Sequence, residues 1–103
     1  MLLLAFDVDG TLWTSNGKVT EEMLVKLELA GSKVVIVSPS TARPKGWDEF
    51  IDGPARRDNL LKARERWPFS VRIYVSDNGD VEEAKAAGFL YVDREDFAEM
   101  MAA

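Results

Sequence analysis

The sequence predicts an α/β fold with three layers, α/β/α, built like a Rossmann fold around a mostly parallel sheet. Three short apolar runs, each bounded by turn residues, are typical of buried strands; they cover residues 2–7, 33–38 and 70–76. Stretches of helical length separate these runs. Because strands that alternate with helices form βαβ units, we expect parallel strands with helices on both faces of the sheet.

The segment after the first strand carries a hairpin signal. Residues 13–19 place Asn16-Gly17 between strand-forming residues, and this dipeptide favours a two-residue type I′ turn. We interpret Trp13, at the start of the segment, as a hydrophobic anchor of the hairpin, with a side chain facing substrate as the alternative.

Four stretches carry helix signals. A helix over 20–30 begins at a Thr N-cap and ends before a glycine. A second helix, over 55–67, ends at Pro68. Shorter helices are expected over 80–88 and from Asp93 onward. The side of the second helix that we expect to pack holds Leu60, Leu61, Arg64 and Trp67.

Two further segments complete the prediction. Residues 39–55 hold three of the four prolines, so we expect a loop there, with one or two helical turns over 47–51. A short last strand is expected over 89–92. The chain has 103 residues, which predicts a single domain over 1–103.

The composition limits the chemistry. Cysteine and histidine are absent, which excludes thiolate catalysis, zinc–thiolate sites and serine–histidine triads. A general base must therefore be a carboxylate, a lysine, a tyrosine or a metal-bound water. The net charge of −5 argues against general nucleic-acid binding. No signal region and no apolar run of about 20 residues occurs, so we expect a soluble, cytoplasmic protein without membrane association.

Two aspartates end the first strand. Alternate side chains of a strand share a face, so Asp7 and Asp9 project the same way. Two carboxylates around one site repel by about 4 kcal/mol at 4 Å and an effective dielectric of 20. A cation relieves that repulsion, and an all-oxygen setting suits Mg²⁺. Gly10 permits a sharp turn, and Thr11 adds a hydroxyl and an amide. The alternative is an ordinary strand that ends in an Asp-Gly turn.

Polar side chains also end the other two strands. Ser38 is the last residue of the second strand, and Asp77 follows the third. Since sites in parallel sheets lie at the carboxyl ends of the strands, we expect Asp7, Asp9, Ser38 and Asp77 to converge. A cleft with carboxylates, a hydroxyl and a basic side chain, but no His or Cys, suits metal-assisted phosphoryl transfer.

The string DVDGTL at residues 7–12 resembles motif I of the haloacid dehalogenase superfamily, whose members are mostly Mg²⁺-dependent phosphohydrolases. The resemblance implies that Asp7 is the nucleophile that forms an aspartyl-phosphate, and that Asp9 is the acid and base. It also implies a Mg²⁺ ion held by Asp7, the backbone carbonyl of Asp9, and Asp77 at the motif IV position. A hairpin after motif I resembles the flap of this fold, and the short insertions resemble members without a cap domain.

The same resemblance suggests which groups hold the phosphoryl group. Ser38 matches motif II, and Thr11 and the amides around it lie in the motif I turn. Motif III is a basic residue near the start of the 55–67 helix. The candidates are Arg56, Arg57 and Lys62. We choose Arg57, because Arg56-Arg57-Asp58 resembles the phosphatase domain of polynucleotide kinases.

The motif IV region departs from the family pattern. Ser76 precedes Asp77 where glycine is usual, and Asp80 comes one residue earlier than the commonest spacing. Asp80 is either a further metal ligand or, with Glu83, a D-x-x-E capping pair at a helix start. Asn78 is a spare oxygen ligand if Asp80 only caps the helix.

We therefore expect a Mg²⁺-dependent phosphomonoesterase that acts on a phosphorylated small molecule or on a macromolecular phosphate. A site without a cap is open, and an oligomer in which a neighbouring subunit supplies a lid is compatible with it. Two alternatives remain: a haloacid dehalogenase-like domain that binds without turnover, and a receiver-like regulatory domain. The sequence leaves the substrate open.

Overall fold

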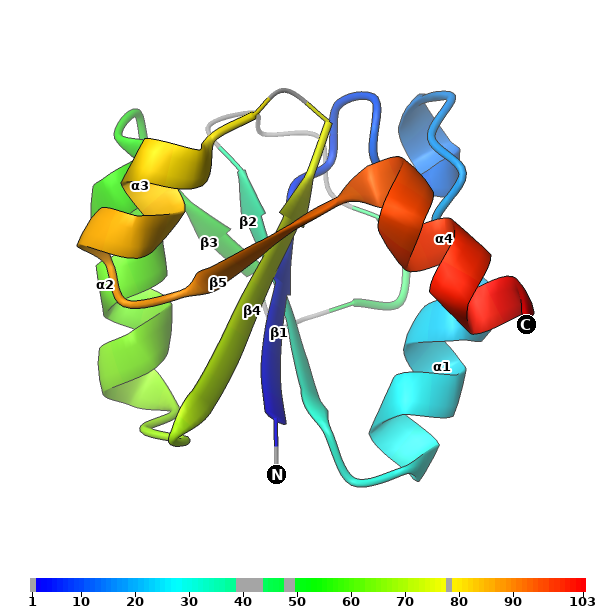
Figure 1. Ribbon diagram of the computed structural model, residues 1–103, viewed down its shortest axis with the longest axis horizontal. Helices are drawn as coiled ribbons and strands as arrows, with labels where there is room; N and C mark the ends of the chain where they lie inside the picture. Colours follow the sequence, from blue (N-terminus) through cyan, green and yellow to red (C-terminus); the bar gives the residue numbers. More distant parts are fainter. Residues whose placement is uncertain (1, 39–43, 48–49, 78) are drawn as a thin grey trace.

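A computed structural model describes residues 2–38, 44–47, 50–77 and 79–103 (Figure 1). A parallel sheet forms its centre, and four strands of four to six residues run in the order β2-β1-β4-β5. A fifth strand of three residues, β3, pairs with β2 at the edge. The strands are β1 (Leu2–Phe6), β2 (Lys33–Ser38), β3 (Phe50–Asp52), β4 (Val71–Ser76) and β5 (Leu90–Asp93).

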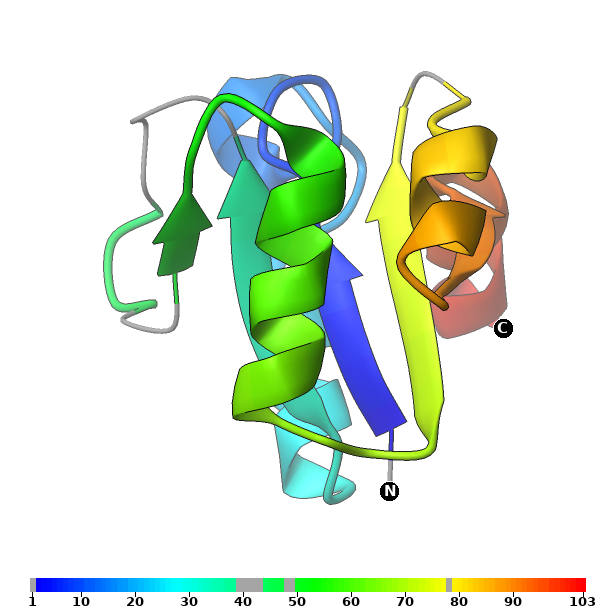
Figure 2. The same ribbon diagram turned by 90° about the vertical axis from the view of Figure 1, so that its left-hand side faces the viewer.

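Helices cover both faces of the sheet. The four α-helices are α1 (Glu21–Leu29), α2 (Arg56–Arg66), α3 (Val81–Ala86) and α4 (Arg94–Ala102). Helices α1 and α4 lie on one face, and α2 and α3 lie on the other (Figure 1). Figure 2 shows that α2 runs back along the sheet, from the carboxyl ends of the strands towards their amino ends. The predicted alternation of strands and helices around a parallel sheet is confirmed.

The core has two halves because β1 is buried on both faces. Leu3 and Ala5 pack among side chains of α2 and α3. Leu4 and Phe6 pack on the other side, among side chains of α1 and α4. The Phe6 ring meets Phe97 of α4 edge to face, with 5.2 Å between the ring centroids. This two-sided burial explains why the strand reads as a continuous apolar run rather than an alternating pattern.

Local signals placed several boundaries correctly. The Thr20 hydroxyl accepts a hydrogen bond from the Met23 amide at 3.3 Å, which caps α1 as predicted. Gly31 takes the left-handed conformation after the helix, with φ +95°. The Asp93 carboxylate accepts from the Glu95 amide at 2.9 Å and caps α4.

The predicted hairpin at 13–19 is wrong. The chain forms a short 3₁₀ helix, η1 (Trp13–Ser15), and then an isolated parallel bridge between Leu12 and Val19. Asn16 takes the left-handed conformation but Gly17 does not, whereas a type I′ turn needs both. Gly17 is required for space instead, because a Cβ there would lie 2.0 Å from the carbonyl carbon of Thr11. Trp13 packs against the core, as an anchor would.

The segment before α2 also differs from the prediction. The helical turns expected over 47–51 are wrong, since Phe50–Asp52 is a strand that pairs with β2. Residues 39–43 and 48–49 lie outside the described residues. The last strand begins at Leu90, one residue later than expected.

The buried side of α2 is rotated relative to the predicted one, although Leu60 belongs to both. Asn59, Leu60 and Ala63 are buried, whereas Leu61 is 40% exposed and Arg64 is exposed. This rotation decides which basic residue at the start of α2 faces the sheet.

No helix within the described part of the chain has the length and apolar character needed to cross a membrane.

Candidate functional site

The strand order reverses at β1, which lies between β2 and β4. The chain passes from β1 to β2 on one side, and later returns to the other side of β1 for β4. In open α/β sheets, ligands bind at such a reversal, beyond the carboxyl ends of the strands. Asp7 follows β1 and Asp77 follows β4, so both lie at the carboxyl ends of the two strands beside this reversal. The Asp7 amide still donates to the Val75 carbonyl at 3.0 Å, which fixes the backbone of Asp7 beside β4.

Asp7 is a buried carboxylate in an unusual electrostatic setting. Its residue surface is 2% exposed, and its Oδ1 atom has no hydrogen-bond partner within the described residues. Burial raises the pKa of Asp7 to about 6, against the lowering effects of the Arg56 guanidinium and the Val8 amide. The charges of Asp77 and Asp9 add to the increase.

The turn after Asp7 requires glycine. Gly10 has φ +73°, and a Cβ there would lie 2.2 Å from Asp77 Oδ2. The missing side chain therefore lets the Asp77 carboxylate rest directly against the turn. The Gly10 amide donates to the Ser15 carbonyl at 3.2 Å, and the Thr11 amide to the Val8 carbonyl at 3.1 Å. These two amides are engaged within the protein.

The remaining residues expected at the first two strand ends differ in exposure. Asp9 is exposed at the surface of the turn. Thr11 is fully buried, and its hydroxyl has no hydrogen-bond partner among the described residues. Ser38, the last residue of β2, is 1% exposed and lies on the strand beside β1. Asp9 is thus the carboxylate of this turn that solvent and a ligand can reach.

Arg56, rather than Arg57, reaches the site. Arg56 Nη2 lies 3.8 Å from Asp7 Oδ1, and Arg56 Nε lies 3.1 Å from Asp80 Oδ2. Arg57 instead pairs with Glu83 at 3.3 Å, where the two side chains are 51% and 40% exposed. Lys62, the third candidate, is exposed farther along α2.

The helix pattern contained a signal for this difference. The buried residues Leu60 and Ala63 lie four and seven positions after Arg56, which is the spacing of one helix face. Arg57 lies four positions before the exposed Leu61. The buried residues of α2 therefore favour Arg56, whereas the choice of Arg57 rested on the resemblance to the phosphatase domain of polynucleotide kinases.

Asp80 turns towards the site instead of capping α3. It occupies the N-cap position, yet its side chain makes no capping hydrogen bond. Its Oδ2 atom accepts a hydrogen bond from Ser76 Oγ at 3.1 Å and contacts Arg56. The capping alternative is wrong. Ser76 supplies the hydroxyl that holds Asp80. Asn78 lies outside the described residues.

Two tyrosines that sequence reasoning did not identify support these groups. The Tyr74 hydroxyl accepts from Arg56 Nε at 2.9 Å, and burial together with the Asp7 charge raises the pKa of Tyr74, which keeps the hydroxyl protonated. The Tyr91 hydroxyl accepts from the Gly79 amide at 3.1 Å and donates to the Ser76 carbonyl at 3.1 Å. Both rings lie in strands, where their hydrophobic character gave no signal of a polar role.

Arg94 is a second guanidinium beside these aspartates. It is the first residue of α4, and its Nη1 donates to the Gly10 carbonyl and lies 3.6 Å from Asp77 Oδ2. Arg94 directly follows the carboxyl end of β5. Since all parallel strands end at the same edge, that position is the signal that could have identified it.

The residues present fit a magnesium ion. Within the described residues, no three acidic side chains form a ready-made ligand group. Mg²⁺ usually keeps several waters and takes only one or two protein carboxylates together with substrate phosphate. Asp7 Oδ1 has no hydrogen-bond partner among the described residues, and the charges of Asp77 and Asp9 act on the same buried carboxylate. A cation there would satisfy that oxygen and relieve the repulsion among the aspartates.

Comparisons with family models, with curated proteins and with solved structures found no match for this chain.

Proposed function

We propose that the chain is a Mg²⁺-dependent phosphohydrolase of the haloacid dehalogenase type, without a cap domain, which hydrolyses phosphomonoesters through an aspartyl-phosphate. One observation carries the proposal. Asp7 directly follows β1 at the reversal of strand order; its buried Oδ1 has no hydrogen-bond partner among the described residues and lies 3.8 Å from the Arg56 guanidinium. The DVDGTL string at residues 7–12 supports the same assignment.

Asp7, Asp77 and the backbone carbonyl of Asp9 would hold the magnesium ion, with Asp80 close by. When bound, the ion supplies positive charge to the phosphate oxygens and keeps Asp7 ionised at neutral pH. The pKa of about 6 applies to Asp7 without the ion.

The side chains of this chain then perform the chemistry. The Asp7 carboxylate attacks phosphorus and forms an acyl phosphate, while the bond to the ester oxygen breaks. Asp9, the exposed carboxyl beside it, gives its proton to that oxygen. Asp9 next takes a proton from a water molecule, which attacks the same phosphorus. Inorganic phosphate leaves and the Asp7 carboxylate is restored.

Arg56 takes the motif III role in this proposal, in place of Arg57. Its guanidinium lies against Asp7, where negative charge gathers during transfer, and Tyr74 and Asp80 fix its orientation. Ser38 supplies the motif II hydroxyl at the end of the neighbouring strand. Thr11 contributes through the shape of the turn, since its hydroxyl is buried.

A second candidate function follows from Arg94. Its guanidinium already pairs with Asp77 and with the Gly10 carbonyl. A permanent internal cation at this point favours a haloacid dehalogenase-like or receiver-like domain that binds or signals without turnover. Neither kind of domain would hydrolyse aryl phosphates, and the receiver-like one would be labelled stably by acetyl phosphate.

Hydrolysis of p-nitrophenyl phosphate with and without Mg²⁺ tests the proposal. We expect turnover that requires Mg²⁺, and Asp7→Asn to lower it by about a thousandfold or more because the nucleophile is lost. Asp9→Asn should also abolish turnover. Asp96→Asn is the matched control, since Asp96 is an exposed aspartate of α4, and it should retain activity. Full activity of Asp7→Asn would overturn the proposal, and stable acetyl phosphate labelling without hydrolysis would establish the second candidate.

A further inference from the structure

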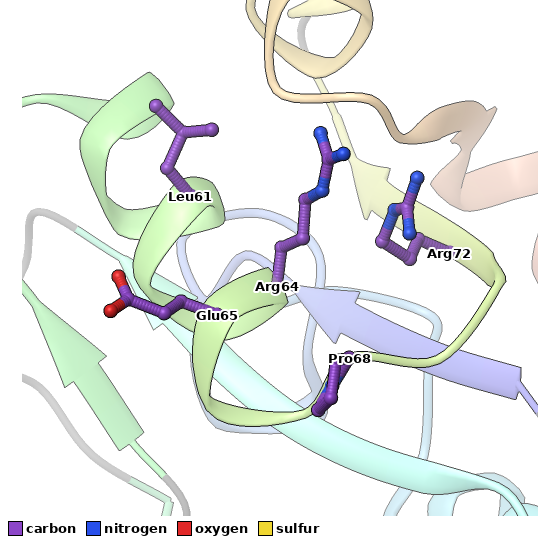
Figure 3. A pocket seen from close by; sticks show the side chains of 5 residues that line it. All are labelled: Leu61, Arg64, Glu65, Pro68 and Arg72. Atoms are coloured by element: carbon purple, nitrogen blue, oxygen red, sulfur yellow. The ribbon is translucent and has the colours of Figure 1, made fainter.

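A cluster of positive charge lies at the opposite end of the sheet from the carboxylates. Arg64 stands near the end of α2, and Arg72 near the start of β4. A hollow of about 440 Å³ lies beside them (Figure 3). The residues that line it are Leu61, Arg64, Glu65, Pro68 and Arg72. About 12 Å of helix separates Arg64 from Arg56, so this hollow is distinct from the Asp7 site.

The two guanidinium groups converge on the turn after α3. Arg64 Nη1 donates to the Ala87 carbonyl at 3.2 Å, and Arg72 Nε donates to the Gly88 carbonyl at 3.0 Å. A Cβ on Gly88 would lie 2.6 Å from Arg64 Nη1 and 3.4 Å from Arg72 Nη2. These two nitrogens therefore lie within about 6 Å of each other, a distance at which two like charges repel.

Neither guanidinium has an acidic partner in the part of the chain that the structure describes. Besides the bonds to the turn, Arg72 Nη1 donates to the Phe69 carbonyl at 2.8 Å. Figure 3 shows the Glu65 carboxylate directed away from both guanidinium groups. Backbone carbonyls carry only partial charge, and a guanidinium has five N–H donors, so both charge and donors remain available to a ligand.

We propose that this hollow binds a phosphate group, either free or as part of a small phosphate ester, between Arg64 and Arg72. Guanidinium groups donate pairs of parallel hydrogen bonds that match phosphate oxygens, and an anion between them removes their mutual repulsion. Leu61, which is 40% exposed, and Pro68 offer apolar surface to the organic part of an ester. The proposal stands on these contacts alone and does not depend on the activity proposed above.

Backbone amide NMR titrations test the proposal on the Mg²⁺-free Asp7→Asn variant, which cannot hydrolyse the ligand. The probes are inorganic phosphate and phenyl phosphate at constant ionic strength. We expect saturable shifts of the Phe69, Arg72, Ala87 and Gly88 amides at millimolar ligand. Tighter binding of phenyl phosphate would identify the ester as the ligand, and equal binding would identify phosphate itself.

Charge-removing variants distinguish specific binding in the hollow from general electrostatic attraction of the anion. Arg64→Gln and Arg72→Gln should each weaken binding about tenfold, the cost of one charge-assisted interaction. Arg66→Gln removes one charge from the same end of α2 outside the hollow and should bind as before. If circular dichroism shows that Arg72→Gln fails to fold, the binding measured for Arg64→Gln alone tests the proposal. Absence of saturable shifts at this turn, or unchanged binding by Arg64→Gln, would overturn the proposal.

Discussion

Replacing Asp7 by asparagine should stabilise the metal-free protein while it removes activity. Asn has the shape of Asp but carries no charge, so the substitution isolates the free energy of burying the ionised carboxylate. The pKa of Asp7 rises from 3.8 to about 6 on folding, a shift of about two units. At about 1.36 kcal/mol per unit, ionised Asp7 costs the folded state roughly 3 kcal/mol.

The sign of the pH dependence follows from the raised pKa. Well below pH 3.8 Asp7 is protonated in both folded and unfolded states, so the wild type and Asp7→Asn should be equally stable there. Between pH 3.8 and about 6 the folded state holds the proton more tightly, and the stability of the wild type falls as pH rises. Well above pH 6 Asp7 is ionised in both states, and the folded state bears the full free-energy cost of burying the charge. The variant should then be more stable by up to about 3 kcal/mol.

Urea unfolding followed by tryptophan fluorescence measures this difference from about pH 4 to pH 8, with a chelator present. Addition of Mg²⁺ at pH 8 should stabilise the wild type and leave Asp7→Asn unchanged, because the ion neutralises the buried charge. A difference in stability that is constant across the pH range would refute the reasoning. So would a variant less stable than the wild type at pH 8.

Three further substitutions test other contacts of the site. Arg56→Gln should lower kcat/KM for an aryl phosphate by about a hundredfold, whereas Arg57→Gln, at an exposed position, should change it by about threefold at most. Equal effects of the two substitutions would contradict the proposal that Arg56 is the catalytic arginine. Gly10→Ala should lower the melting temperature more than Gly79→Ala. Both glycines have positive φ, but only a Cβ at Gly10 would clash with Asp77, so equal decreases in melting temperature would contradict the close contact between Gly10 and Asp77. Tyr74→Phe should raise KM and cost about 1 kcal/mol of stability in urea unfolding, since its hydroxyl orients the Arg56 guanidinium; an unchanged KM would contradict that role.

The sheet and its order of elements could be predicted because the responsible signals are local. Buried parallel strands require continuous apolar runs, and Leu2–Phe6 and Lys33–Ser38 have them. The Thr20 cap is likewise a local hydrogen bond. The edge strand Phe50–Asp52 was missed because three residues are too few to show a period.

Tertiary packing overrode the strongest local turn signal. Asn16-Gly17 favours a hairpin in isolation, but the close approach of Gly17 to the Thr11 backbone fixes a different turn. This contact between Gly17 and Thr11 depends on the fold of residues 10–19 as a whole, so the conformational preference of a dipeptide cannot predict it.

The strand-end carboxylates could be predicted, and their partners could not. Asp7 and Asp77 follow β1 and β4, so topology alone brings them to one edge of the sheet. The choice of Arg56 depends on the rotation of α2, a mostly charged helix whose apolar face is narrow. Arg94 and Tyr91 lie near the C-terminal end of the sequence and belong to no recognisable motif, although they contact Gly10 and Ser76.

A crystal structure of the protein with Mg²⁺ and beryllium fluoride, a mimic of the phosphoryl group, tests the central claim most directly. The account predicts the mimic on the Asp7 carboxylate and one metal ion in contact with oxygens of both Asp7 and Asp77. Carboxylates that point apart, with no ion between them and no mimic on Asp7, would contradict it.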